Sequence, residues 1–126
     1  KGNYMTNVSS IIKSEGVKFD TGKVRMELLP PEFLLAVATI LTFGAQKYAD
    51  RNWELGMKWS RVFGALMRHM WVWWGNKEER TTNNFLFGPL DLETGYSHLW
   101  HAGACLAFLT TYEERKVGED DRVHLS

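Results

Sequence analysis

The sequence predicts an all-α fold, a compact helical bundle of three main helices preceded by a short irregular N-terminal segment. Three long stretches carry apolar residues at helical spacing, and Pro, Ser or Gly residues stand at their ends. Beyond the short amino-terminal region, no stretch shows convincing alternation of polar and apolar residues, as a half-buried strand would. The 126 residues, 44% of them hydrophobic, suit one domain with a packed core. We expect an N-terminal extension over residues 1–16, one helical domain over 17–115 and a polar tail over 116–126.

The first helix is expected to run from Pro31 to Gly44 or Lys47, because proline is tolerated in the first helical turn. It is apolar almost all round, which indicates a central place in the core. Residues 50–56 are rich in turn-forming residues and end in a glycine, so they are expected to form a loop.

The second helix is expected to begin with Ser60 as its N-cap and to end near Gly75. It carries two adjoining apolar stripes. One stripe contains Val62, Leu66, His69 and Trp73, and the other contains Phe63, Met67, Met70 and Trp74. Stripes of this width indicate deep burial or oligomerisation, and the three tryptophans on this helix favour a homo-oligomer.

The third helix is expected from about Thr94 to about Arg115, again with a dense apolar face. Residues 78–90, which precede it, are expected to form an exposed loop with an apolar tip at residues 85–87.

The charge balance argues against two classes of partner. Lys and Arg number 15, as do Asp and Glu, so the basic excess typical of proteins that bind nucleic acid or anionic membranes is missing. The longest apolar stretch, residues 33–43, falls far short of the ~20 residues that span a bilayer. A single cysteine, Cys105, excludes an intramolecular disulfide and suits a reducing compartment. We therefore expect a cytoplasmic protein.

Acidic and imidazole side chains gather around the predicted third helix. Asp91 and Glu93 lie at its start, and His98 and His101 follow on one ridge. His69 lies on the apolar face of the second helix. Carboxylate with imidazole is a ligand set for Mn, Fe, Zn or Ni, whereas Mg prefers oxygen alone. The alternative is that the acids are helix caps and the histidines are satisfied core groups.

Two metal-enzyme signatures are absent from the sequence. It contains no His-Asp dipeptide, as in the metal-dependent HD phosphohydrolases, and no His-Glu-x-x-His, as in the zincins. The histidines must therefore be judged by where the helices place them.

A basic turn lies near the amino terminus. It is not a phosphate-binding P-loop, because five residues separate Gly16 from Gly22 and Val24 replaces the required hydroxyl. A turn with two lysines and an arginine can still present charge and N–H groups to a polyphosphate. These three residues are Lys18, Lys23 and Arg25. The alternative is a solvated charged loop.

A third group of residues follows the first helix and continues onto the second. It contains Lys47, Tyr48, Asp50, Arg51, Asn52 and Trp53, followed by Trp59 and by Arg68 on the second helix. Aromatic rings can stack on a base, an amide can read its edge, and cations can hold phosphates. The alternative is that Arg68 is a surface residue and that Trp53 covers the helix ends.

Four blocks of residues occur in a fixed order over about residues 17–112. They are Lys18-Phe-Asp20-Thr-Gly22-Lys23-Val-Arg25 with Leu29-Pro30-Pro31, Phe43-Gly44-Ala-x-Lys47-Tyr48 with Asn52-Trp53, Arg68-His69, and Glu93-x-Gly95-x-x-His98-x-x-His101-Ala102. Together they resemble the phage-type dATP/dGTP diphosphohydrolase domain. The resemblance implies a small all-α, metal-dependent enzyme that converts dGTP or dATP to dGMP or dAMP plus pyrophosphate, in phage purine nucleotide metabolism.

The resemblance leads to expected roles for the candidate residues, with residues 17–115 as the catalytic domain. Asp91 and Glu93 are expected to be catalytic and to hold a divalent metal, Mg²⁺ or Mn²⁺, with further ligands from His69, His98 or His101. The expected phosphate-binding residues are Lys18, Lys23, Arg25, Lys47 and Arg68. The expected base- and sugar-binding residues are Asp20, Tyr48, Asn52 and Trp53.

Other interpretations stay open. The MazG-like nucleoside triphosphate pyrophosphohydrolases are similar in size and helical make-up, but their Glu-Glu-x-x-Glu and Glu-x-x-Asp metal motifs are absent from this sequence, so a MazG-like fold is an analogy. A non-catalytic, oligomeric helical binding module would use the histidines structurally. A house-cleaning hydrolase would differ only in acting on modified nucleotides.

Overall fold

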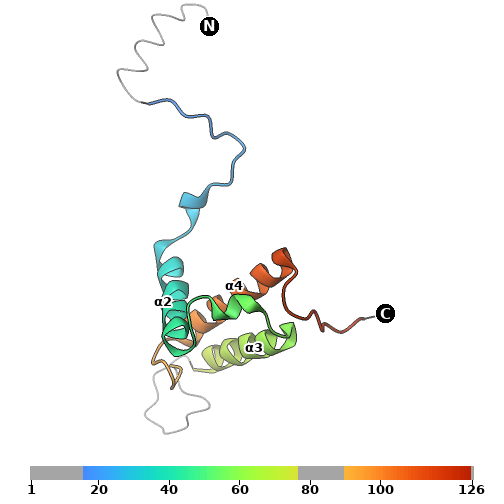
Figure 1. Cartoon of the computed structure of the whole chain (residues 1–126). Coiled ribbons are helices and arrows are strands. Elements are labelled where there is room, and N and C mark those ends of the chain that lie inside the picture. The colour runs from blue at the N-terminus through green and yellow to red at the C-terminus, as the bar shows by residue number, and fades with distance from the viewer. Residues whose placement is uncertain (1–15, 77–89, 126) are drawn as a thin grey trace, which may run out of the picture.

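The computed structural model describes residues 16–76 and 90–125 of the chain (Figure 1). Its elements are η1 (Met26–Leu28), α2 (Pro31–Lys47), η2 (Asn52–Leu55), α3 (Trp59–Gly75) and α4 (His98–Arg115), where η marks a short 3-10 helix. Within these residues there is no β-strand, only two isolated bridges, which confirms the all-α prediction. None of the helices in these two ranges is long and apolar enough to cross a membrane.

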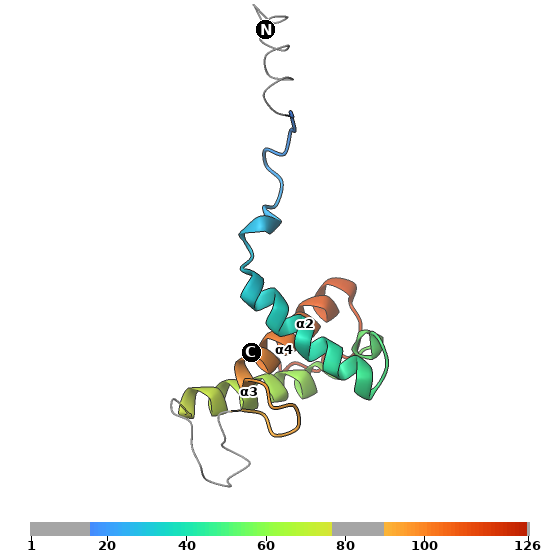
Figure 2. The same ribbon diagram turned by 90° about the vertical axis from the view of Figure 1, so that its left-hand side faces the viewer.

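The helix α4 is the centre of the fold, and both α2 and α3 pack against it (Figures 1 and 2). Small residues at positions 102–104 of α4 are buried and let the neighbouring helices approach closely. A Cβ atom added at Gly103 would lie 3.1 Å from Val37 Cγ2 and 3.3 Å from Phe33 Cε1. The glycine therefore sets the close approach between α2 and α4.

The prediction that the first helix is central was wrong, although its bounds were correct. Only Ala36 and Ile40 of α2 are buried, and its apolar residues 33–35 are exposed. An all-apolar helix has no face that must point inward, so its apolar content alone did not identify the central element.

The core between α3 and α4 is small. It is built on Val62, Cys105 and the fully buried Tyr112. The Tyr112 hydroxyl donates a hydrogen bond of 2.6 Å to the Trp53 carbonyl oxygen. This bond fixes η2 against α4, because a buried carbonyl without a partner is costly.

Residues 117–121, which the sequence analysis assigned to a polar tail, pack against the start of α3. The Trp59 N–H donates to the Glu119 carbonyl oxygen at 3.0 Å, and the Glu119 N–H donates to the Met57 carbonyl oxygen at 3.3 Å. The Trp59 indole N–H donates to the Val117 carbonyl oxygen at 2.9 Å. The folded part of the chain therefore extends past the end of α4.

The same segment caps α3. The helix begins at Trp59 with Lys58 at the N-cap position, so the predicted Ser60 cap lies inside the helix. Asp121 supplies the capping carboxylate, because its Oδ1 accepts a hydrogen bond from the Ser60 N–H at 2.9 Å.

Replacing Gly118 by Ala is expected to lower the free energy of unfolding by about 2–3 kcal/mol. Gly118 has a φ of +80°, and an added Cβ would overlap the Met57 carbonyl oxygen and lie 3.2 Å from Trp59 Nε1. Urea denaturation would measure the change. Gly75→Ala is the control, because a Cβ there meets nothing within 4 Å and the φ is ordinary. Equal free energies of unfolding for the two variants would show that the contacts of residues 117–121 do not contribute to stability.

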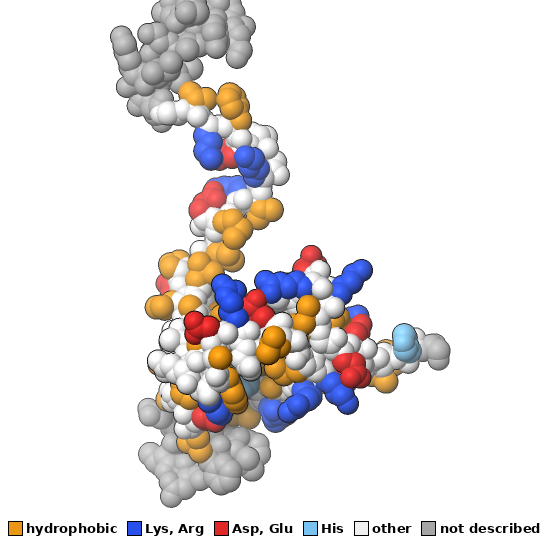
Figure 3. All heavy atoms as spheres, viewed as in Figure 1, with side chains coloured by type: hydrophobic (Ala, Val, Ile, Leu, Met, Phe, Trp, Pro, Cys, Tyr) orange, Lys and Arg blue, Asp and Glu red, His pale blue; other side chains and the backbone are white. Residues whose placement is uncertain are grey.

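The segment formed by residues 16–30 stands clear of the three helices in both views (Figures 1 and 2). Hydrophobic and basic side chains follow one another along it in the space-filling view (Figure 3). All of its residues are exposed, including large apolar ones such as Phe19 and Val24.

Candidate active site

The helix that carries two of the candidate histidines begins later than the sequence predicted. α4 starts at His98, and the Ser97 hydroxyl oxygen caps it by accepting a backbone N–H at 3.1 Å. Gly95 has a φ of +76°, which interrupts helical geometry before that point. Asp91 and Glu93, which were predicted to lie directly at the start of the helix, therefore lie in a separate turn outside it.

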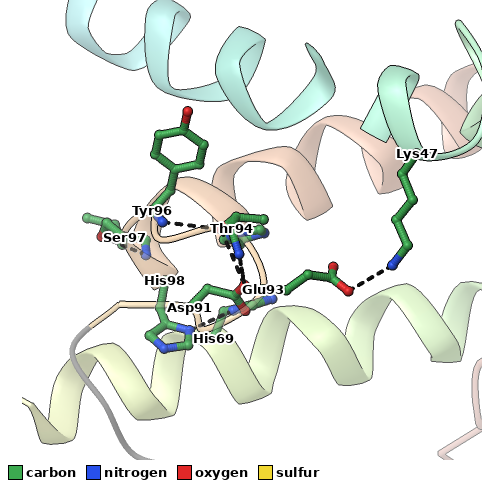
Figure 4. Close-up of polar contacts among 10 residues, drawn as sticks. Lys47, His69, Asp91, Glu93, Thr94, Tyr96, Ser97 and His98 are labelled. Atoms are coloured by element: carbon green, nitrogen blue, oxygen red, sulfur yellow. Dashed lines mark hydrogen bonds and ion pairs between the residues drawn. The ribbon is translucent and has the colours of Figure 1, made fainter. Parts of the chain in front are cut away.

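This turn, residues 90–97, directs the Asp91 carboxylate toward α3. Its ends are joined by the Asp91 N–H, which donates to the Tyr96 carbonyl oxygen at 2.9 Å. The Thr94 N–H and hydroxyl donate to Asp91 Oδ1 at 3.0 and 3.3 Å (Figure 4). Partial burial alone would raise the pKa of Asp91, but the Thr94 bonds and the nearby histidines outweigh it, and the net shift is downward. The carboxylate is therefore ionised at neutral pH.

Three histidines meet where α3 and α4 pack together. His69 Nδ1 lies 2.9 Å from His98 Nδ1, so one ring nitrogen donates its proton to the other (Figure 4). The His69 and His101 rings stack with their centroids 4.7 Å apart and an interplanar angle of 13°. The His98 side chain is buried. Their placement on apolar faces of packed helices therefore brought them together, as the sequence analysis expected.

Thr94 connects Asp91 to His101. Its hydroxyl oxygen lies 2.7 Å from His101 Nε2, and that nitrogen lies 3.8 Å from Asp91 Oδ1. The sequence analysis did not single out Thr94. The Asp-x-x-Thr spacing was an available signal, because a carboxylate at this spacing often accepts backbone and hydroxyl hydrogen bonds in a turn.

His69, Asp91 and His98 form a group that can hold a metal ion. Each offers one ligand atom, and these atoms all lie within 4.8 Å of one another. Ligands about 2.1 Å from an ion stand about 3.0–3.4 Å apart in octahedral or tetrahedral geometry. The histidine pair, at 2.9 Å, nearly meets this requirement, and the carboxylate needs a small movement. Two imidazoles with one carboxylate suit Mn, Zn or Fe better than Mg.

The protonation of the histidines favours metal binding. Burial, together with the nearby His101 and His98, lowers the pKa of His69 to about 4. Burial also lowers the pKa of His101. Neutral imidazoles keep the lone pair that a metal needs.

The metal-free protein is expected to lose stability as the pH falls from about 6.5 to about 4. In this window unfolded chains protonate residue 69 while the folded His69 stays neutral, so the unfolded state binds more protons. We expect the free energy of unfolding in EDTA to be roughly 1 kcal/mol lower at pH 5 than at pH 7 from this group, after allowing for its partial exposure. His69→Gln should remove this contribution, while the exposed His124→Gln should keep it. An unchanged pH slope in His69→Gln would contradict the assignment.

Glu93 does not join this group. Its carboxylate turns away from His69 and His98 and accepts a hydrogen bond from Lys47 Nζ at 2.8 Å (Figure 4). This bond is the main reason that the pKa of Lys47 is raised. Both side chains are exposed, so the pair can separate at little cost.

A cavity of about 180 Å³ lies between α2, η2, α4 and the 90–97 turn. It lies beside the cluster formed by the candidate metal-binding group His69, Asp91 and His98 together with Thr94 and His101, which contact that group. Its lining residues are Ile40, Leu41, Phe43, Gly44, Ala45, Lys47, Tyr48, Ala49, Arg51, Asn52, Trp53, Glu93, Thr94, His101 and Phe108. Trp53 stacks on Phe108 with ring centroids 4.5 Å apart. The cavity therefore combines aromatic walls, cationic groups and two residues of the cluster. Phe108 was missing from the sequence-based site, whereas Arg51 belonged to the predicted third group of residues.

The structure does not bring the remaining candidates to the cavity. Lys18, Asp20, Lys23 and Arg25 lie on the segment that stands clear of the helices (Figures 1 and 3). Arg68 is exposed on α3, where its charge contributes to the lowered pKa of the adjacent histidine. Their roles in binding phosphate or sugar stay predictions.

The fold and site define a small all-α domain with a candidate metal centre beside a cavity. The chain belongs to the family described as "dATP/dGTP diphosphohydrolase, N-terminal", whose model matches residues 13–122. This confirms the resemblance carried by the four sequence blocks.

A curated relative agrees with the family assignment. The chain is 36% identical over 107 residues to a dATP/dGTP diphosphohydrolase of Salmonella phage PMBT28, in an alignment that covers 85% of this chain and 33% of the relative. The chain thus spans about a third of that protein's length. No solved structure matches the chain, and the MazG analogy stays a prediction.

Proposed function

We propose that this chain is a metal-dependent hydrolase domain that converts dGTP or dATP to the monophosphate and pyrophosphate, in phage purine nucleotide metabolism. The observation that carries the proposal is that the cavity borders the cluster. Thr94 and His101 line the cavity and contact each other, and His101 also stacks on His69 in the cluster. The cavity exceeds the 150 Å³ of an engineered cavity that holds benzene, so it has room for a base but not for a whole nucleotide. A base in the cavity would leave its phosphates outside, beside the cluster.

His69, Asp91 and His98 would hold the divalent ion. When bound, the ion would neutralise phosphate charge and make the attacking water more acidic. The neutral His69 imidazole and the ionised Asp91 carboxylate support this assignment, and the ligand types favour Mn²⁺ over Mg²⁺.

Lys47 would bind phosphate, and Glu93 would act as the general base. A triphosphate carries more charge than one carboxylate, so Lys47 would leave Glu93 and bind phosphate. The freed Glu93 carboxylate would accept a proton from water as the water oxygen bonds to the α-phosphorus. The α–β bridging oxygen would leave with the pyrophosphate, and Lys47 would offset its charge.

The walls of the cavity suit an aromatic base. Trp53 and Tyr48 present rings for stacking, and the Asn52 amide offers both a donor and an acceptor for the base edge. Arg51 adds a second cation to the lining of the cavity.

The test is pyrophosphate release by the purified chain from dGTP, dATP, dCTP and a panel of modified triphosphates, with Mn²⁺ or Mg²⁺. We expect dGTP and dATP to be hydrolysed at least ~10-fold faster than dCTP, and faster with Mn²⁺ than with Mg²⁺. Glu93→Gln should abolish release while the helical circular dichroism signal is unchanged. A folded, metal-binding protein that hydrolyses none of these would instead be a binding module, and one that prefers modified triphosphates would be a house-cleaning hydrolase.

A further inference from the structure

The helix α3 carries an apolar stripe that nothing covers in the described structure. Its members are Phe63, Met67, Met70, Trp71 and Trp74, and they are between 40% and 73% exposed. At 100° per residue these positions fall on one face of the helix. The adjoining stripe, which includes the buried Val62 and half-buried His69, faces α4 instead. The two stripes of the sequence therefore have different environments.

The size of this outer stripe fits a protein interface. Five side chains of these types and exposures present on the order of 600 Å² of surface. The largest apolar patch on a typical monomer is about 300–600 Å², whereas a stable interface buries about 800 Å² on each partner. The stripe alone thus supplies most of one side of such an interface.

The pattern of the stripe favours a second helix of the same kind as its partner. Phe63, Met67, Met70 and Trp74 follow a 4-3-4 spacing, which is the seam of two helices that pack side by side. The arginines of α3, Arg61 and Arg68, lie about 120° from the centre of the stripe, so a partner helix need not bury a charge. Two copies of one stripe can match each other around a two-fold axis.

We propose that the chain forms a homodimer in which the α3 stripes of two copies pack against each other. The methionines near the middle of the stripe would adapt to their counterparts, and the tryptophans would bury the largest areas. Trp73 and Trp74, whose ring centroids lie 6.1 Å apart, connect this surface to the stripe that carries His69. The dimer would therefore support the helix that presents a metal-binding residue, whether or not the chain hydrolyses nucleotides.

The first test is the molar mass of the protein in solution, by light scattering at about 100 µM, well above the Kd of a stable dimer. The wild type should have twice the chain mass of 14.6 kDa, and Met67→Glu should have the mass of one chain. Leu35→Glu is the matched control, because Leu35 is equally apolar and exposed but lies on α2. A monomeric wild type, or an assembly split by Leu35→Glu and not by Met67→Glu, would overturn the proposal.

A second test does not depend on the folding of a charged variant. Met67→Cys and Met70→Cys place a thiol near the two-fold axis, and a short bis-maleimide should link most of each variant into a covalent dimer. Burial raises the pKa of the native Cys105 thiol to about 11, so at pH 7 it should not react. Leu35→Cys should stay uncrosslinked. Absence of crosslinking at both methionine positions would contradict the interface.

Discussion

Asp91→Asn is expected to lower the affinity for Mn²⁺ by about 100-fold or more and to abolish most pyrophosphate release. The loss of a direct ligand should cost at least as much as the 10–100-fold typical of its outer-shell partners. Asparagine keeps an oxygen that can accept the two Thr94 hydrogen bonds, so the 90–97 turn should keep its shape. Calorimetric titration with Mn²⁺ and pyrophosphate release would measure the two effects.

The control for this variant is Asp50→Asn, because Asp50 is an exposed acid in the loop after α2. It should bind Mn²⁺ and release pyrophosphate like the wild type. If Asp91→Asn bound Mn²⁺ with unchanged affinity, the metal would have to lie elsewhere. If Asp91→Asn lost activity but still bound Mn²⁺, Asp91 would contact the substrate and not the ion.

Lys47→Gln is expected to lower kcat/KM for dGTP by about 30–100-fold, because a charge-assisted hydrogen bond is worth about 2–3 kcal/mol. In the free protein Lys47 binds Glu93 at 2.8 Å, and in the complex it would bind phosphate. The variant loses this contact both in the bound substrate and in the transition state, so KM should rise. Steady-state kinetics with dGTP would measure both parameters.

Lys58→Gln is the matched control, because Lys58 is an exposed lysine at the start of α3, outside the cavity lining. It should change kcat/KM by less than about threefold. Metal affinity should be unchanged in Lys47→Gln, which separates its effect from that of Asp91→Asn. A kcat/KM for Lys47→Gln within threefold of the wild type would show that the Lys47–Glu93 pair is only a surface ion pair.

The positions of the helices could be predicted from local signals. Pro31 at the first turn of α2 and the apolar periodicity of α3 fixed both helices to within two residues, apart from the end of α2, for which two positions were open. Which helix is central could not be read in this way. That depends on Gly103 and its small neighbours, which permit close packing but contribute little to an apolar pattern.

The candidate site, like the fold, could be predicted only in part. The convergence of His69 with His98 followed from two apolar faces that pack together. The different directions of Asp91 and Glu93 did not, because they depend on the Gly95 turn and on the hydrogen bonds from Thr94. The cavity also needed tertiary information, since Phe108 reaches it from α4 while Trp53 comes from η2.

Diffraction from crystals grown with MnCl₂, recorded where manganese scatters anomalously, tests the proposed metal centre most directly. We expect one anomalous peak within about 2.3 Å of a side-chain atom of each of His69, Asp91 and His98, with the imidazole N–H···N bond broken. A fully occupied manganese held by other residues, with the two rings still 2.9 Å apart, would contradict it.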